Sequence, residues 1–120
     1  MQVLAWSGST VNHFNGGNDG ETFYAIFDPQ SDSVGALQSV NNNHDMFCPG
    51  IAALPNGDLV VVGWAKTEDG GEASSVFNGS GFVAGPKLNI IRGYNSAVTL
   101  SNGRVRPPGL LPLSDSIQCR

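Results

Sequence analysis

The sequence contains few charged residues. Lys, Arg, Asp and Glu together make up 13% of its 120 residues, and the six Lys and Arg are scattered along a chain of formal net charge −4. Proteins that bind nucleic acid or anionic membrane surfaces gather positive charge on one face. We therefore expect neither a nucleic acid nor a membrane among the partners of this chain.

Long apolar runs are also absent, and cysteine is rare. Apolar stretches such as Leu59 to Val62 are far too short to cross a bilayer, and Met1 is followed by neither a basic region nor a secretory apolar core. Two cysteines, Cys48 and Cys119, permit one disulfide but leave the cellular compartment open.

Glycine and proline are plentiful and separate short apolar runs. Sixteen glycines and seven prolines punctuate the chain, and no apolar pattern of helical period persists for three turns. The sequence therefore predicts an all-β protein. The expected strands are Gln2 to Trp6, Thr22 to Phe27, Gly50 to Leu54, Asp58 to Trp64, Ala73 to Phe77 and Ser96 to Leu100.

Two Asn-Gly pairs indicate a repeat. Asn56-Gly57 and Asn102-Gly103 each join two apolar runs, as in a tight β-hairpin. The two glycines are 46 residues apart, which lies in the range of propeller blades built from four strands. Roughly two blades are visible, whereas closed propellers have about four to eight. We predict an incomplete β-propeller over residues 1–105.

The last fifteen residues break this repeat. Where the period requires another strand, the sequence has Arg106-Pro107-Pro108-Gly109, and proline cannot donate to a central ladder. We expect residues 106–120 to form an irregular tail without secondary structure. Truncation, splicing or a misread frame would explain such a tail, and the transcript sequence would test this explanation.

The repeat makes Cys48 and Tyr94 equivalent, because each precedes its turn glycine by nine residues. Inner strands of neighbouring blades converge on the propeller axis, so the two side chains are expected within contact distance. Plainer roles for both residues remain open from the sequence alone. Cys48 suits a small buried thiol or a disulfide with Cys119, and Tyr94 suits an aromatic residue that caps a strand with its hydroxyl in water.

Several segments resemble galactose oxidase. They are His44-Asp45-Met46-Phe47-Cys48-Pro49-Gly50, Arg92-Gly93-Tyr94, Ser101-Asn102-Gly103-Arg104-Val105, Trp6-Ser7, Phe14-Asn15-Gly16-Gly17, Phe27-Asp28-Pro29 and Gly85-Pro86. The resemblance runs from about Val3 to Val105. It implies a kelch-like propeller and an extracellular copper radical oxidase that acts on primary alcohols of sugars or on small aldehydes, with O2 consumed and H2O2 released.

The resemblance also implies roles for individual residues. Cys48 and Tyr94 would form a thioether-linked radical cofactor, with Tyr94 as a copper ligand, and Phe14 would line the substrate pocket. The family's second Tyr, two His and stacking Trp have no counterparts in this chain. We therefore expect the isolated chain to lack stable copper binding and to be inactive.

The two histidines do not replace these missing ligands. His13 and His44 are widely spaced, and their spacing suits neither a short zinc motif nor the copper ligands of the family. We expect both in loops, with His44 serving as a hydrogen-bonding residue ahead of a strand. Trp6 and Trp64 are expected to pack between blades.

Two alternatives remain open at this stage. One is a kelch-like interaction or carbohydrate-binding module without chemistry, and the other is a truncated gene product without a function of its own. Asn78-Gly79-Ser80 matches the acceptor pattern for N-glycosylation, which makes Asn78 a candidate modification site in a secreted protein.

Overall fold

The computed structural model describes residues 2–8, 21–41, 44, 46, 49–63, 72–90 and 95–107. Within these ranges the regular elements are all strands, and the pairings are antiparallel. The strands are β1 (Val3–Gly8), β2 (Glu21–Asp28), β3 (Ser33–Val34), β4 (Gln38–Asn41), β5 (Gly50–Ala53), β6 (Leu59–Val62), β7 (Ser74–Phe77), β8 (Phe82–Ala84), β9 (Val98–Thr99) and β10 (Val105–Arg106). The all-β prediction is confirmed.

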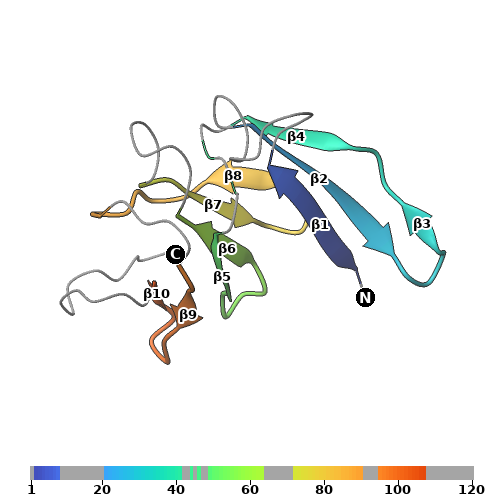
Figure 1. The fold of residues 1–120 in the computed structure, drawn as a ribbon. Coiled ribbons are helices and arrows are strands. Elements are labelled where there is room, and N and C mark those ends of the chain that lie inside the picture. The colour runs from blue at the N-terminus through green and yellow to red at the C-terminus, as the bar shows by residue number, and fades with distance from the viewer. Residues whose placement is uncertain are drawn as a thin grey trace.

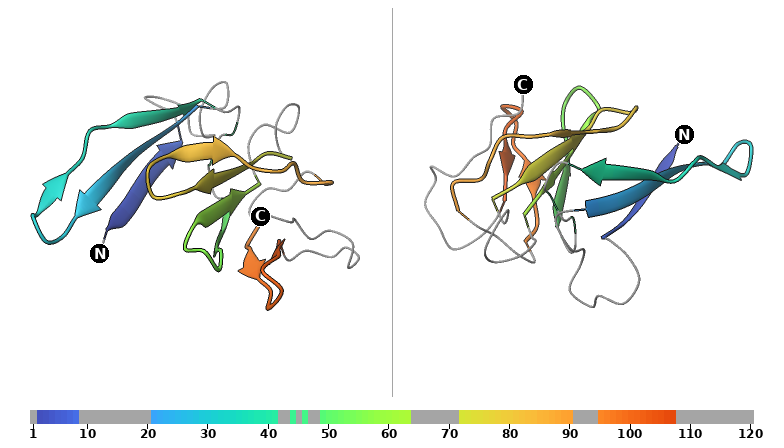
Figure 2. Two further views of the ribbon diagram at one scale, coloured as in Figure 1. Left: turned by 180° about the vertical axis from the view of Figure 1, so that it is seen from behind. Right: turned by 90° about the horizontal axis from the view of Figure 1, so that it is seen from above.

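The strands form three sheets, which lie in chain order in Figure 1. In the first sheet β1 pairs with β2, and the other edge of β2 carries both β3 and β4. The middle sheet has the order β5-β6-β7-β8, and the third sheet contains β9 and β10. Seen from two further sides, the middle sheet again lies between the other two (Figure 2). The middle sheet has four strands side by side, the first sheet is three strands wide, and the third has two strands. This arrangement is consistent with about two blades of a β-propeller.

The two Asn-Gly turns have the same structure, which supports the repeat of 46 residues. In the first turn the Gly57 amide donates to the Leu54 carbonyl at 3.0 Å, and in the second the Gly103 amide donates to that of Leu100 at 2.9 Å. Both glycines have positive φ, 93° and 79°, which glycine adopts without steric cost. In each turn the asparagine Oδ1 accepts a hydrogen bond from the backbone amide two residues later, that of Asp58 or Arg104.

Two apolar clusters bind the sheets to one another. The cluster between the first and middle sheets consists of Tyr24, Val40, Met46, Val61 and Phe77, with Leu4, Trp6, Ile26, Leu59 and Phe82 packed against it. Tyr24 and Phe82 meet edge to face with their ring centroids 5.2 Å apart, an arrangement that adds about 0.5–1.5 kcal/mol to the burial of such a pair. The packing role expected for Trp6 is confirmed, whereas Trp64 lies outside the described residues.

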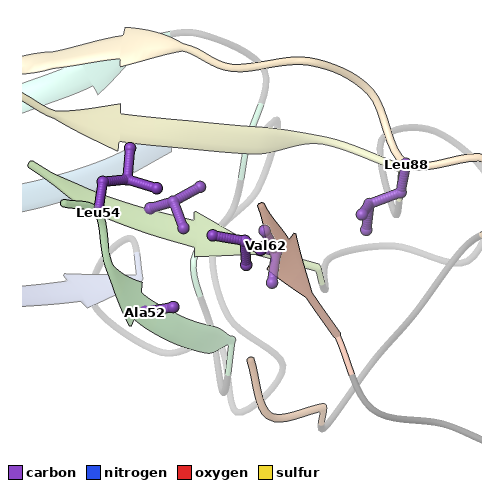
Figure 3. Packing of buried hydrophobic residues seen from close by; sticks show 6 residues of the cluster. Ala52, Leu54, Val62 and Leu88 are labelled. Atoms are coloured by element: carbon purple, nitrogen blue, oxygen red, sulfur yellow. The ribbon is translucent and has the colours of Figure 1, made fainter. Parts of the chain in front are cut away.

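The second cluster joins the middle sheet to the third. It consists of Ala52, Leu54, Val60, Val62, Leu88 and Val105, and Figure 3 shows Ala52, Leu54 and Val62 beside β5 and β6. Alternate residues of β6 serve the two clusters, with Val60 and Val62 on one side and Val61 on the other. This period of two is what the pleat of a strand dictates.

The observed strands differ from the predicted ones at the sheet edges. Strands β3, β4 and β8 were not expected, because each has only two to four residues and too short an apolar pattern to stand out. Strand β10 includes Arg106, so the expectation that secondary structure stops before this residue was wrong by one position. Pro107 lies outside the strand, whereas residues 108–120 lie outside the described part of the chain.

Candidate functional site

The inner strands of the middle and third sheets, β5 and β9, contact each other at equivalent positions of the repeat. The Thr99 hydroxyl donates to the Ala53 carbonyl, and these two residues are 46 positions apart. Near the start of the same strands, the Gly50 amide donates to Asn95 Oδ1 at 2.9 Å. Gly50 is two residues after Cys48, and Asn95 directly follows Tyr94. The chain segments that follow the two predicted cofactor residues therefore lie side by side.

Gly50 permits this close approach because it has no side chain. A Cβ atom at this position would lie 2.8 Å from the carbonyl carbon of Ser96 and 2.9 Å from its oxygen. Both are backbone atoms, so no side-chain rotation could relieve the overlap. Sequence reasoning did not identify Gly50 or Asn95. The available signal was the shift of 46 residues, which aligns Gly50 with Ser96, a second small residue.

The side chain of Asn95 has a hydrogen-bond donor without a partner at this junction. Its Oδ1 accepts from Gly50, whereas its buried Nδ2 has no hydrogen-bond partner in the described part of the protein. A buried polar group without a partner costs about 1–3 kcal/mol. The position beside Tyr94 thus carries a donor that a further polar group could satisfy.

The segment that leads into Cys48 is anchored through His44, whose side chain is fully buried. Nε2 of the ring lies 3.1 Å from the Gly63 carbonyl oxygen, and Nδ1 lies 2.7 Å from Ser75 Oγ. A carbonyl can only accept, so in the neutral ring Nε2 carries the hydrogen and Nδ1 accepts from the Ser75 hydroxyl. The expectation of a hydrogen-bonding loop residue is confirmed for His44, whereas His13 lies outside the described residues.

Thr22 fixes the backbone of the same segment. Its hydroxyl donates to the His44 carbonyl at 3.1 Å and accepts from the Met46 amide at 3.0 Å. Thr22 belongs to the first sheet, whereas Ser75 and Gly63 lie in or next to the middle sheet. His44 and Met46 are therefore held between two sheets, two to four residues before Cys48.

Burial lowers the pKa of His44 from its ordinary value of 6.5, although the hydrogen bond to the Gly63 carbonyl acts in the opposite direction. The unfolded chain then binds a proton at a higher pH than the folded chain does. This contribution to stability is complete above about pH 6.5 and is lost as the pH falls toward the folded-state value.

We therefore expect the free energy of unfolding to fall between pH 7.5 and pH 5.5, with a slope from this one group of at most about 1.4 kcal/mol per pH unit. Urea denaturation at a series of pH values measures it. His44→Gln should flatten the profile, whereas His13→Gln should leave it unchanged. An acid sensitivity that disappears in His13→Gln would contradict the assignment to His44.

The predicted site residues themselves, Cys48, Tyr94 and Phe14, lie outside the described residues, as does Cys119. Their roles and contacts stay predictions. Asn78 is described and lies exposed in the turn between β7 and β8, where its Oδ1 accepts from the amides of Ser80 and Gly81. The acceptor pattern for glycosylation thus lies in an exposed turn, and modification of Asn78 stays a prediction.

The described residues do not fit a copper site. No three His, Cys, Asp or Glu side chains come together among them as metal ligands do. Both ring nitrogens of His44 are occupied by Ser75 and Gly63, so this histidine has no lone pair left for a metal. In the same part of the chain, no helix has the length and apolar character needed to cross a membrane.

The chain is similar in sequence to known proteins. Two galactose oxidase sequences from Gibberella zeae are each 35% identical to the chain over 106 residues, which is 87% of this chain. The resemblance of this chain to galactose oxidase is confirmed. It spans 15% of the length of these galactose oxidases. No protein-family model matches the chain.

A solved structure shows the same fold. A fungal alcohol oxidase of the AA5 family, in complex with copper, superposes on this chain with a TM-score of 0.72, over 90% of this chain and 24% of its own. The sequence identity is 24%, so the likeness concerns the fold. The copper belongs to that alcohol oxidase.

Proposed function

We propose that this chain is the part of a secreted copper radical oxidase that carries the thioether pair Cys48 and Tyr94, in a propeller of the kelch type. The parent activity is oxidation of primary alcohols of sugars, or of small aldehydes, with O2 as acceptor and H2O2 as product. Isolated, the chain is inactive, because a copper site needs several ligands and Tyr94 is the one ligand that the resemblance assigns to this sequence.

The observation that carries the proposal is the contact between Gly50 and Asn95. The Gly50 amide and Asn95 Oδ1 are 2.9 Å apart, and Gly50 packs against the Ser96 backbone so closely that a Cβ would overlap it. These residues follow Cys48 and Tyr94 by two positions and one position. Because the chain segments that follow Cys48 and Tyr94 lie side by side, a covalent bond between these two side chains is favoured. The identity to galactose oxidase supports the same assignment.

A copper-loading experiment tests the cross-link. The purified chain is incubated with Cu(II) in air and digested with a protease, and the peptide masses are measured by mass spectrometry. Formation of the thioether removes one hydrogen from the Cys48 thiol and one from the Tyr94 ring, with O2 as the acceptor. We expect a joined peptide two hydrogens lighter than its parts, at low yield because Tyr94 alone binds copper weakly. Cys48→Ser should abolish it and Cys119→Ser should not. Unmodified peptides throughout would favour a binding module.

The same samples test the expected inactivity. With galactose or a small aldehyde as substrate, we expect H2O2 release no higher than that of copper in buffer, while a galactose oxidase relative serves as the positive control. Copper-dependent turnover by the wild-type chain that Tyr94→Phe abolishes would contradict the claim that the isolated chain is inactive.

A further inference from the structure

The turn between β7 and β8 carries an acceptor pattern for an N-linked glycan, which the proposed activity does not use. Asn78-Gly79-Ser80 is the one Asn-X-Ser/Thr triplet of the sequence. Such triplets are common by chance, so the folded turn decides whether a glycan fits. All three residues of the triplet are exposed, and nothing lies within 4 Å of a Cβ built at Gly79. The tip of this turn therefore has open space around it.

The hydrogen bonds of the turn leave the side-chain nitrogen of Asn78 available. Asn78 Oδ1 accepts from the Ser80 amide at 3.0 Å and from the Gly81 amide at 3.1 Å. The backbone amide of Asn78 donates to the Gly81 carbonyl at 3.1 Å. These bonds use Oδ1 and the backbone, whereas an N-linked glycan is attached through Nδ2. The folded turn can therefore keep its hydrogen bonds when Asn78 is modified.

The turn is exposed although its sheet has a neighbour on either side. The middle sheet lies between the first and third sheets (Figures 1 and 2), so the exposure of this turn is not a consequence of where the sequence begins. Gly81 is the turn residue that approaches the first sheet, because a Cβ built there would lie 3.2 Å from the Tyr24 hydroxyl. Asn78 itself is exposed, so a glycan on it need not displace the first sheet.

Strand β8, which follows this turn, is the free edge of the middle sheet. It ends the order β5-β6-β7-β8, and among the described strands it pairs with β7 alone. Stacked sheets cover one another's faces, whereas an edge strand keeps unpaired backbone groups that can pair with another chain. Charged residues or proline usually protect such an edge. Strand β8 is short, but its residues are Phe, Val and Ala, and Val83 is 50% exposed.

We propose that Asn78 carries an N-linked glycan that covers the free edge of β8. This inference rests on the secretion included in the proposed function. Nδ2 of Asn78 attacks the anomeric carbon of an oligosaccharide held on a lipid pyrophosphate. The bond between that carbon and Nδ2 forms, its bond to the pyrophosphate oxygen breaks, and one Nδ2 proton passes to a base of the transferase. Strand β8 spans only roughly 10 Å, which an oligosaccharide of several rings can cover.

Expression of the 120-residue chain behind a secretion leader in yeast tests the modification, with secreted and retained chain both analysed because attachment precedes export. We expect a mass increase that an endoglycosidase removes. Ser80→Ala and Asn78→Asp should each abolish it, although the first keeps the backbone amide and the second the Oδ1 acceptor of the turn. Asn102→Asp is the matched control and should keep the glycan. An unmodified wild-type chain would overturn the proposal. Failure of the Cys48–Tyr94 cross-link would leave this result unaffected, because neither residue takes part.

Aggregation followed by light scattering tests whether the glycan covers the edge of β8. We expect the Ser80→Ala chain, which lacks the glycan, to aggregate after a shorter lag time than the glycosylated chain. Adding Val83→Lys to this variant should restore the longer lag, because a lysine on an edge strand opposes pairing with another chain. Val98→Lys is the control for added charge, since Val98 is 48% exposed on the third sheet, and it should not restore the lag. Equal lag times with and without the glycan would contradict the covering role, as would equal rescue by the two lysines.

Discussion

Gly50→Ala is expected to destabilise the chain by about 1–3 kcal/mol, the range for an added methyl group in a tightly packed site. The new Cβ would lie within 3 Å of the Ser96 carbonyl group and 3.1 Å from the Ala97 nitrogen. Because these are backbone atoms, β5 and β9 must separate and the bond from the Gly50 amide to Asn95 lengthens or breaks. Urea denaturation measures the loss of stability. Faster hydrogen exchange at Gly50–Ala53, with exchange in β2 unchanged, would locate the damage at this junction.

Gly57→Ala is the matched control for this prediction. Nothing lies within 4 Å of a Cβ at Gly57, but its φ of +93° is a conformation that other residues adopt at a cost, about 1–2 kcal/mol for an L-residue. It should lower stability without separating β5 from β9. After copper loading, Gly50→Ala should therefore lower the yield of the Cys48–Tyr94 peptide more than Gly57→Ala does. Equal yields in the two variants would contradict the role given to Gly50.

The repeat was the part of the fold that the sequence determined best. Asn56-Gly57 and Asn102-Gly103 signal hairpins through local turn chemistry alone, and the structure forms both turns with the same hydrogen bonds. Strands β3, β4 and β8 were missed because their own apolar patterns are short. Strands β3 and β4 each form by pairing with β2, and β8 forms by pairing with β7. Edge strands take their conformation from a neighbour, so tertiary context outweighs local propensity.

The surroundings of the candidate site were harder to predict than its likeness to galactose oxidase. The step of 46 residues predicted that Cys48 and Tyr94 occupy equivalent positions ahead of β5 and β9. The hydrogen bond between Thr99 and Ala53, which are also 46 residues apart, is consistent with this alignment of the two strands. Nothing local marks Thr22 as the partner of both His44 and Met46, because the bonds join residues 22 and 24 positions apart. Such contacts follow from the stacking of two sheets, and a single sequence carries no pattern for them.

His44→Ala is expected to have the largest effect of the substitutions considered, a loss of about 3–5 kcal/mol. The side chain is fully buried, so its removal leaves a cavity and deprives the Gly63 carbonyl of its Nε2–H donor. Ser75 Oγ also loses its bond to Nδ1. Small domains have only about 5–15 kcal/mol of stability in total, so the variant should lose a large fraction of its stability. Thermal and urea denaturation measure this loss.

Two comparisons separate the hydrogen bonds of His44 from its packing. His44→Gln keeps an amide that can donate toward Gly63, so it should recover part of the stability lost in His44→Ala while removing the titrating ring. Lys87→Ala is the surface control, because Lys87 and Glu72 form an exposed ion pair and such pairs contribute about 0–1 kcal/mol. If His44→Ala were no more destabilising than Lys87→Ala, His44 would not anchor the chain ahead of Cys48. A stable His44→Ala that lost only the cross-link would instead mean that the ring acts on Cys48 without supporting the fold.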